Sequence, residues 1–209
     1  MTLEKISFRM KKVFISLFVT LLIAGCAKEE VSVTQSEYFI KFYGSYLENT
    51  GYDVKETSDG GLVIVGSEER ESTGKDIVLM KVDEYGNQAE WSPKYFGGGS
   101  DDEGYAVEVT DNGFLIAGSI TNNEGDRDAY LIRTNSQGNM IGQEYTYGES
   151  DDEYAVSIEN REDGGYMVVG YSEGATENSR NFFVISLDPD LSDPRVTTSK
   201  SNQEKILQY

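Results

Sequence analysis

The residue types that carry most enzymatic chemistry are scarce in this sequence. It contains no histidine and a single cysteine among 209 residues, so the usual general bases, nucleophile partners and zinc ligands are missing. Carboxylates remain, and they gather in Asp101-Asp102-Glu103 and Asp151-Asp152-Glu153. Two carboxylates can hydrolyse a glycosidic bond. These clusters recur at matching places in a repeat, however, whereas a reaction needs its catalytic pair once. We therefore interpret them as turn residues and expect no enzyme.

Clustered carboxylates also suit a hard cation. Calcium is therefore the alternative ligand that we consider for Asp101, Asp102, Asp151 and Asp152. The loop 122–128 adds further acidic side chains, but neither stretch has the spacing of an EF-hand. We favour solvated loops and expect neither a metal nor a cofactor. The glycine-rich run 97–100 is not followed by Gly-Lys-Ser/Thr, so it predicts a turn between repeats and not a phosphate site.

Aromatic side chains are the other candidates for binding, because their faces can stack on the apolar surfaces of sugars. The sequence has 14 tyrosines and one tryptophan, Trp91. Most of the tyrosines recur on predicted strands at positions that we expect to face the core. Trp91 occurs in one repeat only, so it is the aromatic residue that we select as a candidate for a glycan platform.

An internal repeat supplies the elements that must position these residues. An Asp-Gly-Gly or Asp-Asn-Gly turn, followed by an apolar segment and a glycine, occurs over 59–66, 111–118 and 163–170. The closing glycines are 52 residues apart in both intervals. Each unit opens with Tyr-Asp-Val or Tyr-Ala-Val, at Tyr52, Tyr105 and Tyr154. The units therefore predict three copies of one supersecondary structure.

Within a unit, the segments are short and rich in β-branched and aromatic residues. Asp-Gly, Gly-Asn or acidic turns separate them, which is typical of antiparallel strands joined by hairpins. In the second unit we expect four strands, near 105–110, 114–119, 128–134 and 140–147. The segments 37–43 and 205–209 also look like fourth strands, one before the first unit and one at the end of the third.

Four strands in about 50 residues resemble the blade of a β-propeller. The units are similar to bacterial propeller-type repeats, which combine Asp-Glu-Gly-Tyr, Asp-Gly-Gly, an apolar strand, Asp-Val-Tyr-Leu-Ile-Lys and Gly-Asn. This resemblance covers residues 42–187 and implies an all-β fold of about three four-stranded antiparallel blades. Because closed propellers usually have 4 to 8 blades, we expect an open or incomplete structure. An open arc or a truncated product is favoured over an oligomer that closes the ring.

The N-terminal segment has the order of a secretory signal, with Lys11 and Lys12 before an apolar run that is too short to span a bilayer as a helix. The run ends in Ile23-Ala24-Gly25-Cys26, which resembles the lipobox of bacterial lipoproteins. That resemblance implies cleavage before Cys26 and attachment of fatty chains to it, which hold a protein stably at a membrane. Met10 begins a conventional signal and is an alternative start.

We therefore divide the chain into a signal peptide (1–25), an acidic tether (26–37) and a repeat domain (38–209) with units near 45–97, 98–148 and 149–209. The net charge of −19 becomes about −22 without the signal, which disfavours nucleic acid as a partner. The residues after Cys26 predict the outer membrane, with display at the cell surface as one alternative. We expect a non-catalytic binding or scaffold role toward a protein or glycan.

Overall fold

The computed structural model describes residues 38–174, 180–189, 191, 195–198 and 204–206. The predicted signal peptide 1–25, Cys26 and the tether 26–37 lie outside the described residues. The compact unit that contains the described residues begins at Ser36. None of its described segments is a helix long and apolar enough to cross a membrane.

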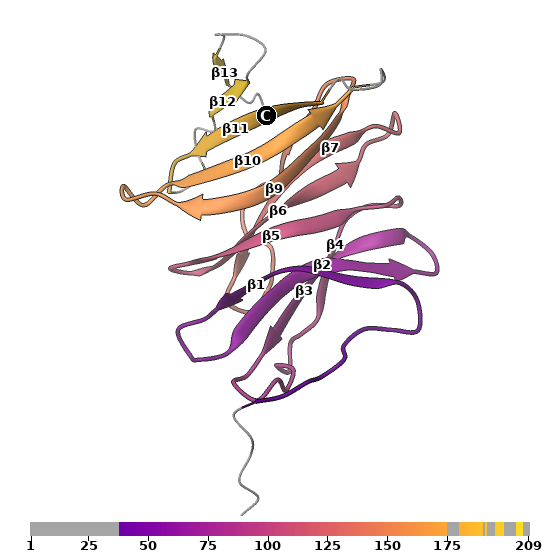
Figure 1. The fold of residues 1–209 in the computed structure, drawn as a ribbon, viewed down its shortest axis with the longest axis vertical. Coiled ribbons are helices and arrows are strands. Elements are labelled where there is room, and N and C mark those ends of the chain that lie inside the picture. The colour runs from indigo at the N-terminus through magenta and orange to yellow at the C-terminus, as the bar shows by residue number, and fades with distance from the viewer. Residues whose placement is uncertain (1–37, 175–179, 190, 192–194, 199–203, 207–209) are drawn as a thin grey trace, which may run out of the picture. The chain divides into compact units, whose positions relative to one another are not determined.

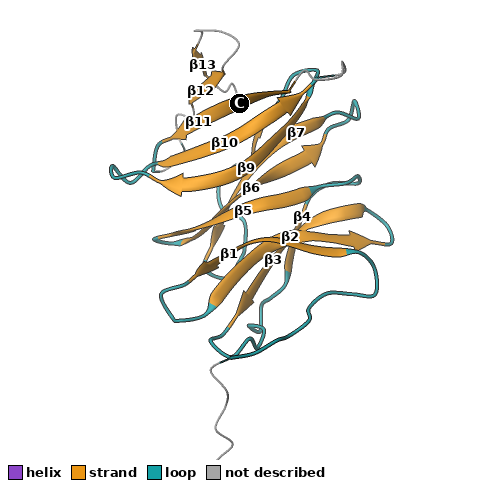
Figure 2. Cartoon of the chain, in the orientation of Figure 1, coloured by secondary structure: helices purple, strands orange, loops and turns teal. Residues whose placement is uncertain are grey.

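The described chain folds into three antiparallel sheets that follow one another along the sequence (Figure 1). The first sheet contains β1 (Asn49–Glu56), β2 (Leu62–Arg70), β3 (Gly74–Val82) and β4 (Lys94–Phe96). The second contains β5 (Glu103–Thr110), β6 (Gly113–Thr121), β7 (Arg127–Asn135) and β8 (Tyr145–Tyr147). The third contains β9 (Asp152–Asn160), β10 (Tyr166–Glu173), β11 (Arg180–Leu187), β12 (Arg195–Thr198) and β13 (Glu204–Ile206). Every described element is a strand or a loop (Figure 2).

The fold class predicted from the repeat is confirmed: the structure is all-β, with three repeated antiparallel sheets, none of them closed. Strand order follows chain order in all three sheets, so each is a meander of antiparallel strands. The Asp-Gly-Gly turns lie between the first two strands of their sheets. In one of them Gly60 has φ +79°, and Asp59 Oδ1 accepts the N–H of Gly61 at 3.1 Å. Glycine is needed there because side chains disfavour positive φ.

We call the face of a sheet on the N-terminal side of the series its rear face and the opposite face its forward face. The forward face of one sheet thus packs on the rear face of the next. Two hydrophobic clusters fill the two interfaces between sheets. In the first interface, Val63, Val65, Ile77 and Leu79 of the first sheet pack on Val107, Phe114, Ile116, Tyr130 and Ile132 of the second. In the second interface, Leu115, Ala117, Ala129 and Leu131 pack with residues of the third sheet that include Ala155, Val168 and Phe183. The alternation of strand residues thus buries both faces of the middle sheet.

The outermost strands differ from the prediction. The fourth strand of the second unit is confined to Tyr145–Tyr147, with only an isolated bridge between Met140 and Thr134 before it. Residues 38–43 form no strand, so that prediction is wrong for the described part of 37–43. At the other end, β13 covers Glu204–Ile206, and 207–209 lie outside the described residues.

A β-bulge near the start of each first strand sets the register of its sheet. Tyr52 and Tyr105 are the extra residues, because Gly51 pairs with Gly66 and Asp53 with Val65, and the second sheet repeats this pattern. In the third sheet Ala155 pairs with Gly170 and Ser157 with Val169. The extra residue there is Val156, so Tyr154 takes the place that Glu103 has in the second sheet. The sequence alignment of Tyr154 with Tyr105 is therefore wrong by two residues, because Val156 is the structural counterpart of Tyr105.

Candidate functional site

Four tyrosines form a continuous contact chain across the three sheets, which we call the tyrosine row: Tyr52, Tyr105, Tyr154 and Tyr171. The ring centroids of Tyr52 and Tyr105 are 5.0 Å apart, those of Tyr105 and Tyr154 6.3 Å, and those of Tyr154 and Tyr171 4.9 Å. Tyr52 and Tyr105 are the extra residues of their bulges, which redirect side chains at the end of a strand pair, whereas Tyr154 and Tyr171 are paired residues of β9 and β10. Tyr52 is the most exposed member, at 44%.

Glu103 and Arg127 connect the tyrosine row by polar contacts. Glu103 Oε2 accepts the hydroxyl of Tyr105 at 2.7 Å and Nη1 of Arg127 at 3.0 Å, while its Oε1 accepts the hydroxyl of Tyr52 at 3.3 Å. The Arg127 guanidinium carbon lies 5.9 Å from the ring centroid of Tyr154. Charge-assisted bonds and cation–π contacts of this kind fix side-chain orientation. The row is therefore an ordered surface.

At its outer end the row carries a second guanidinium. The carbon of the Arg180 guanidinium lies 4.4 Å from the ring centroid of Tyr171, and Nη2 of Arg180 is 2.7 Å from Glu173 Oε1. Both members of this ion pair are about half exposed. A binding partner can therefore reach Arg180, and surface pairs of this type contribute little to stability.

The phenol groups of the row act as neutral donors. Burial and the hydrogen bond to Glu103 raise the pKa of Tyr105 well above its usual value. Burial and the charge of Glu103 also raise the pKa of Tyr52. Both hydroxyls therefore stay protonated at neutral pH. The row can therefore donate hydrogen bonds and offer apolar ring surface.

The predicted acidic clusters lie in the connections between sheets. Asp101 Oδ1 accepts the N–H of Lys75 at 3.0 Å, and Asp152 Oδ1 accepts the N–H of Arg127 at 2.9 Å. Each bond joins the start of one sheet to the third strand of the preceding one. Asp152, and not Asp151, is thus the counterpart of Asp101. The clusters recur because each connection needs the same backbone acceptor.

Two acidic residues in these connections are deeply buried. Asp102 is 0% exposed, and its carboxylate accepts the N–H of Gly98 at 2.5 Å and of Thr121 at 2.9 Å. Its counterpart, Glu153, accepts the N–H of Glu149 at 3.2 Å. Burial raises the pKa of Asp102, and burial with the nearby charges of Asp128 and Asp151 raises that of Glu153 to about 7.

Within the described residues, no group of three acidic side chains converges in a way that could hold a metal ion. Asp101, Asp102 and Asp152 each use a carboxylate oxygen to accept a backbone N–H group. In the loop 122–128, Asn122 Oδ1 accepts the N–H groups of Glu124 and Asp126 at 2.9 and 3.1 Å. That loop is thus closed by its own hydrogen bonds, as an Asx-type turn is.

Trp91 lies apart from the tyrosine row. It is partly buried against the cluster between the first and second sheets, 6.5 Å from Phe114 between ring centroids. Its ring also covers Gly138, where an added Cβ would lie 2.7 Å from Trp91. Phe39 covers Gly86 in the same way. Trp91 therefore fills a place that a phenylalanine fills in the first unit.

The spacing of Tyr52, Tyr105 and Tyr154 is visible in the sequence, but the prediction assigned most tyrosines to the core. Among the described residues only Tyr130 and Tyr166 are buried there. An acidic residue close to Tyr105 in the sequence, Glu103, was the available signal. Its contact with Arg127 was not visible, because the two residues are 24 positions apart and meet only in the folded sheet. Cys26 lies outside the described residues.

Neither a protein-family model nor a curated protein sequence matches this chain.

Proposed function

We propose that this chain is a lipoprotein, anchored to the outer membrane through lipid on Cys26, that binds a partner protein through the tyrosine row without catalysing a reaction. The observation that carries the binding role is the ordered tyrosine row with Glu103 and Arg127. Tyrosine and arginine are enriched where proteins bind one another, because they combine apolar area with hydrogen-bond donors. The anchor is supported by the sequence Ile23-Ala24-Gly25-Cys26 alone.

The anchor is tested in a bacterium with two membranes. Cells that express the full chain, or its Cys26→Ala variant, are grown with a clickable palmitate analogue. Label on the parent chain and none on the variant is the expected result, together with release of the variant from the membrane fraction. Equal labelling of both chains would refute the anchor. Protease added to intact cells then distinguishes surface display from a periplasmic position.

The binding role is tested by placing a photo-crosslinking amino acid at position 52 of the full chain on cells. Position 46 is the matched control, because Tyr46 is 81% exposed and lies outside the tyrosine row. We expect a discrete adduct from position 52 that disappears when Arg127→Gln is added, since the row then loses its ordering contact with Glu103. Identical adducts from both positions would contradict the proposal.

A glycan is the second candidate partner, favoured by the partly exposed rings and by the carboxylate and guanidinium beside them. Its test is a glycan array probed with the parent chain and with Tyr52→Ala and Trp91→Ala variants. Loss of a glycan signal with Tyr52→Ala would assign the row to sugars, whereas loss with Trp91→Ala alone would move the site to Trp91. A glycan signal that neither variant changes would exclude both aromatic sites.

A further inference from the structure

The two outer sheets each leave one face uncovered by any described residue of another sheet. The forward face of the third sheet exposes Met167, Val169 and Phe182 at 36%, 41% and 62%. By register these residues correspond to Leu115, Ala117 and Ala129 of the second sheet, which are at most 1% exposed. The third sheet thus presents an apolar surface of the kind that is buried inside the fold.

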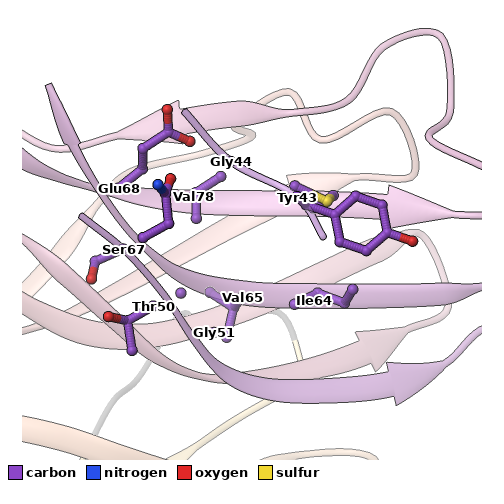
Figure 3. Close-up of a pocket in the computed structure, with 12 residues that line it drawn as sticks. Tyr43, Gly44, Thr50, Gly51, Ile64, Val65, Ser67, Glu68 and Val78 are labelled. Carbon is purple, nitrogen blue, oxygen red and sulfur yellow. The ribbon is translucent and has the colours of Figure 1, made fainter. Parts of the chain in front are cut away.

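The rear face of the first sheet is its counterpart. Leu62, Ile64, Val78 and Met80 stand where Phe114, Ile116, Tyr130 and Ile132 stand in the second sheet. A hollow of about 140 Å³ opens on this face, beside Gly51, Ile64 and Val78 (Figure 3). The figure labels Gly51, Val65 and Ile64 in the lower part of the view and Tyr43 above and to the right of them.

The sizes of facing side chains follow one rule in the two interior interfaces. Gly104, on the rear face of the second sheet, meets Val65 and Ile77, each 2.7 Å from where a Cβ would lie. Ala155, the counterpart of Gly104 in the third sheet, shares its cluster with Ala117 and Ala129, which replace Val65 and Ile77. The smaller residue, Gly104, thus faces two large side chains, and the larger residue, Ala155, shares its cluster with two alanines.

The two uncovered faces satisfy the same rule. Gly51 is the counterpart of Gly104, and among the described residues only Ile64 of its own sheet comes within 4.0 Å of where its Cβ would lie. The residues that correspond to Val65 and Ile77 on the third sheet are Val169 and Phe182, which are large. The free glycine is therefore matched by large side chains on the free forward face.

The acidic acceptors of backbone N–H groups at the rim follow the interior pattern as well. Asp101 and Asp152 each lie four residues after a glycine and accept an N–H from Lys75 or Arg127. Glu48 lies four residues after Gly44, and Arg180 has the register position of Lys75 and Arg127. An acidic group on the first sheet would thus meet the strand start of the third sheet at Arg180, as in both interior interfaces.

We propose that the forward face of the third sheet docks on the rear face of the first sheet of a second copy of this chain, with Phe182 and Val169 filling the hollow at Gly51. The contact is head-to-tail, so each copy uses two different surfaces. Two copies contribute six sheets, a number within the range of closed propellers. The third sheet of one copy then packs on the first sheet of the next copy in the same way as the first sheet packs on the second within one chain.

Docking also gives a role to residues 41–43. This segment precedes Gly44 as β4 precedes Gly97, and Phe39 lies against Gly86 as Trp91 lies against Gly138. Residues 41–43 therefore occupy the sequence position of a fourth strand of a preceding sheet, although they form no strand in the single chain. In the docked pair they meet the edge of β11, where β12 pairs in the single chain. The two segments are alternative partners for that edge.

The test measures the mass of the full-length chain in mild detergent over a dilution series by native mass spectrometry. Gly51→Val fills the hollow, and Phe182→Asp places a charge on the opposite face; both sites have open space, so both variants are expected to fold. Met140→Asp is the matched control, because Met140 is 45% exposed and lies on neither face. We expect a dimer for the parent and the control, and a dissociation constant raised at least about tenfold for each variant.

Mixing the two variants separates this contact from a symmetric one. Gly51→Val keeps an intact forward face and Phe182→Asp keeps an intact rear face. The mixture should therefore form a 1:1 dimer at a concentration at which each variant alone is mostly monomeric. A parent chain that stays monomeric at every concentration would overturn the proposal. So would a variant that assembles like the parent, or a mixture that remains monomeric.

Discussion

At the scale of single residues, the two buried carboxyl groups in the connections between sheets differ in how their charge is stabilised. Asp102 accepts two backbone N–H groups, whereas Glu153 accepts one and lies near the charges of Asp128 and Asp151. Hydrogen bonds from N–H groups favour the charged form, while burial and neighbouring carboxylates favour the neutral form. Of these two carboxyl groups, Glu153 is therefore the one for which the charged form has less stabilisation in the folded chain.

This difference predicts how stability changes with pH. The pKa of Glu153 is about 7 in the folded chain against an ordinary value of 4.5, so folding takes up a proton between these values. The free energy of unfolding should fall by roughly 2 to 3 kcal/mol as the pH rises from about 4.5 to about 7, and change little above it. Glu153→Gln should remove most of that slope and stabilise the chain at pH 8, as measured by urea unfolding at several pH values. An unchanged slope in the variant would show that another group is responsible.

At the scale of the elements, much of the structure follows from the repeat, and the exceptions have local causes. The Asp-Gly-Gly turns and the alternating apolar segments predicted three hairpin-built sheets because both signals depend only on neighbouring residues. The bulge at Val156 could not be placed, since Tyr154-Ala155-Val156 reads like Tyr105-Ala106-Val107 and one inserted residue leaves no mark in the sequence. The tyrosine row was missed because its four members lie on four different strands and meet only in the folded structure.

Two equivalent glycines, one inside the first interface and one on the uncovered rear face of the first sheet, predict different outcomes on substitution. Gly104→Val should lower the free energy of unfolding by about 1 to 3 kcal/mol, because the new side chain would collide with Val65 and Ile77. Gly51→Val should change it by less than about 0.5 kcal/mol, as expected at an open surface position. Denaturant unfolding of the two variants, with the parent as reference, measures both values. Equal losses would mean that the rear face of the first sheet is covered.

At the scale of the whole described unit, stability is distributed through neighbouring sheets. The two hydrophobic clusters share no residue, and the middle sheet supplies one face to each. In such repeat structures each unit contacts only its neighbours, so stability approximates a sum of unit and interface contributions. A substitution that weakens one interface should therefore lower the local stability mainly of the sheets that form that interface.

Phe183→Ala tests this behaviour, because Phe183 is 2% exposed in the second interface and lies 5.1 Å from Tyr147 between ring centroids. The change should cost about 3 to 5 kcal/mol locally. We expect faster amide exchange in β10 and β11 than in β2 and β3, measured by hydrogen–deuterium exchange with mass spectrometry. A uniform increase over all three sheets would instead indicate one cooperative unit.

The pairing of Gly104 with Val65 and Ile77, and of Ala155 with Ala117 and Ala129, also bears on how such a chain can change during evolution. Three copies of one unit invite recombination, yet these units are not interchangeable, because each junction accepts only a matching set of side-chain volumes. A swap that brought Ala155 against Val65 and Ile77 would create an overlap, and one that brought Gly104 against two alanines would leave a void. The order of the units is thus fixed by steric volume, and any duplication must be followed by compensating substitutions on both sides of the new junction.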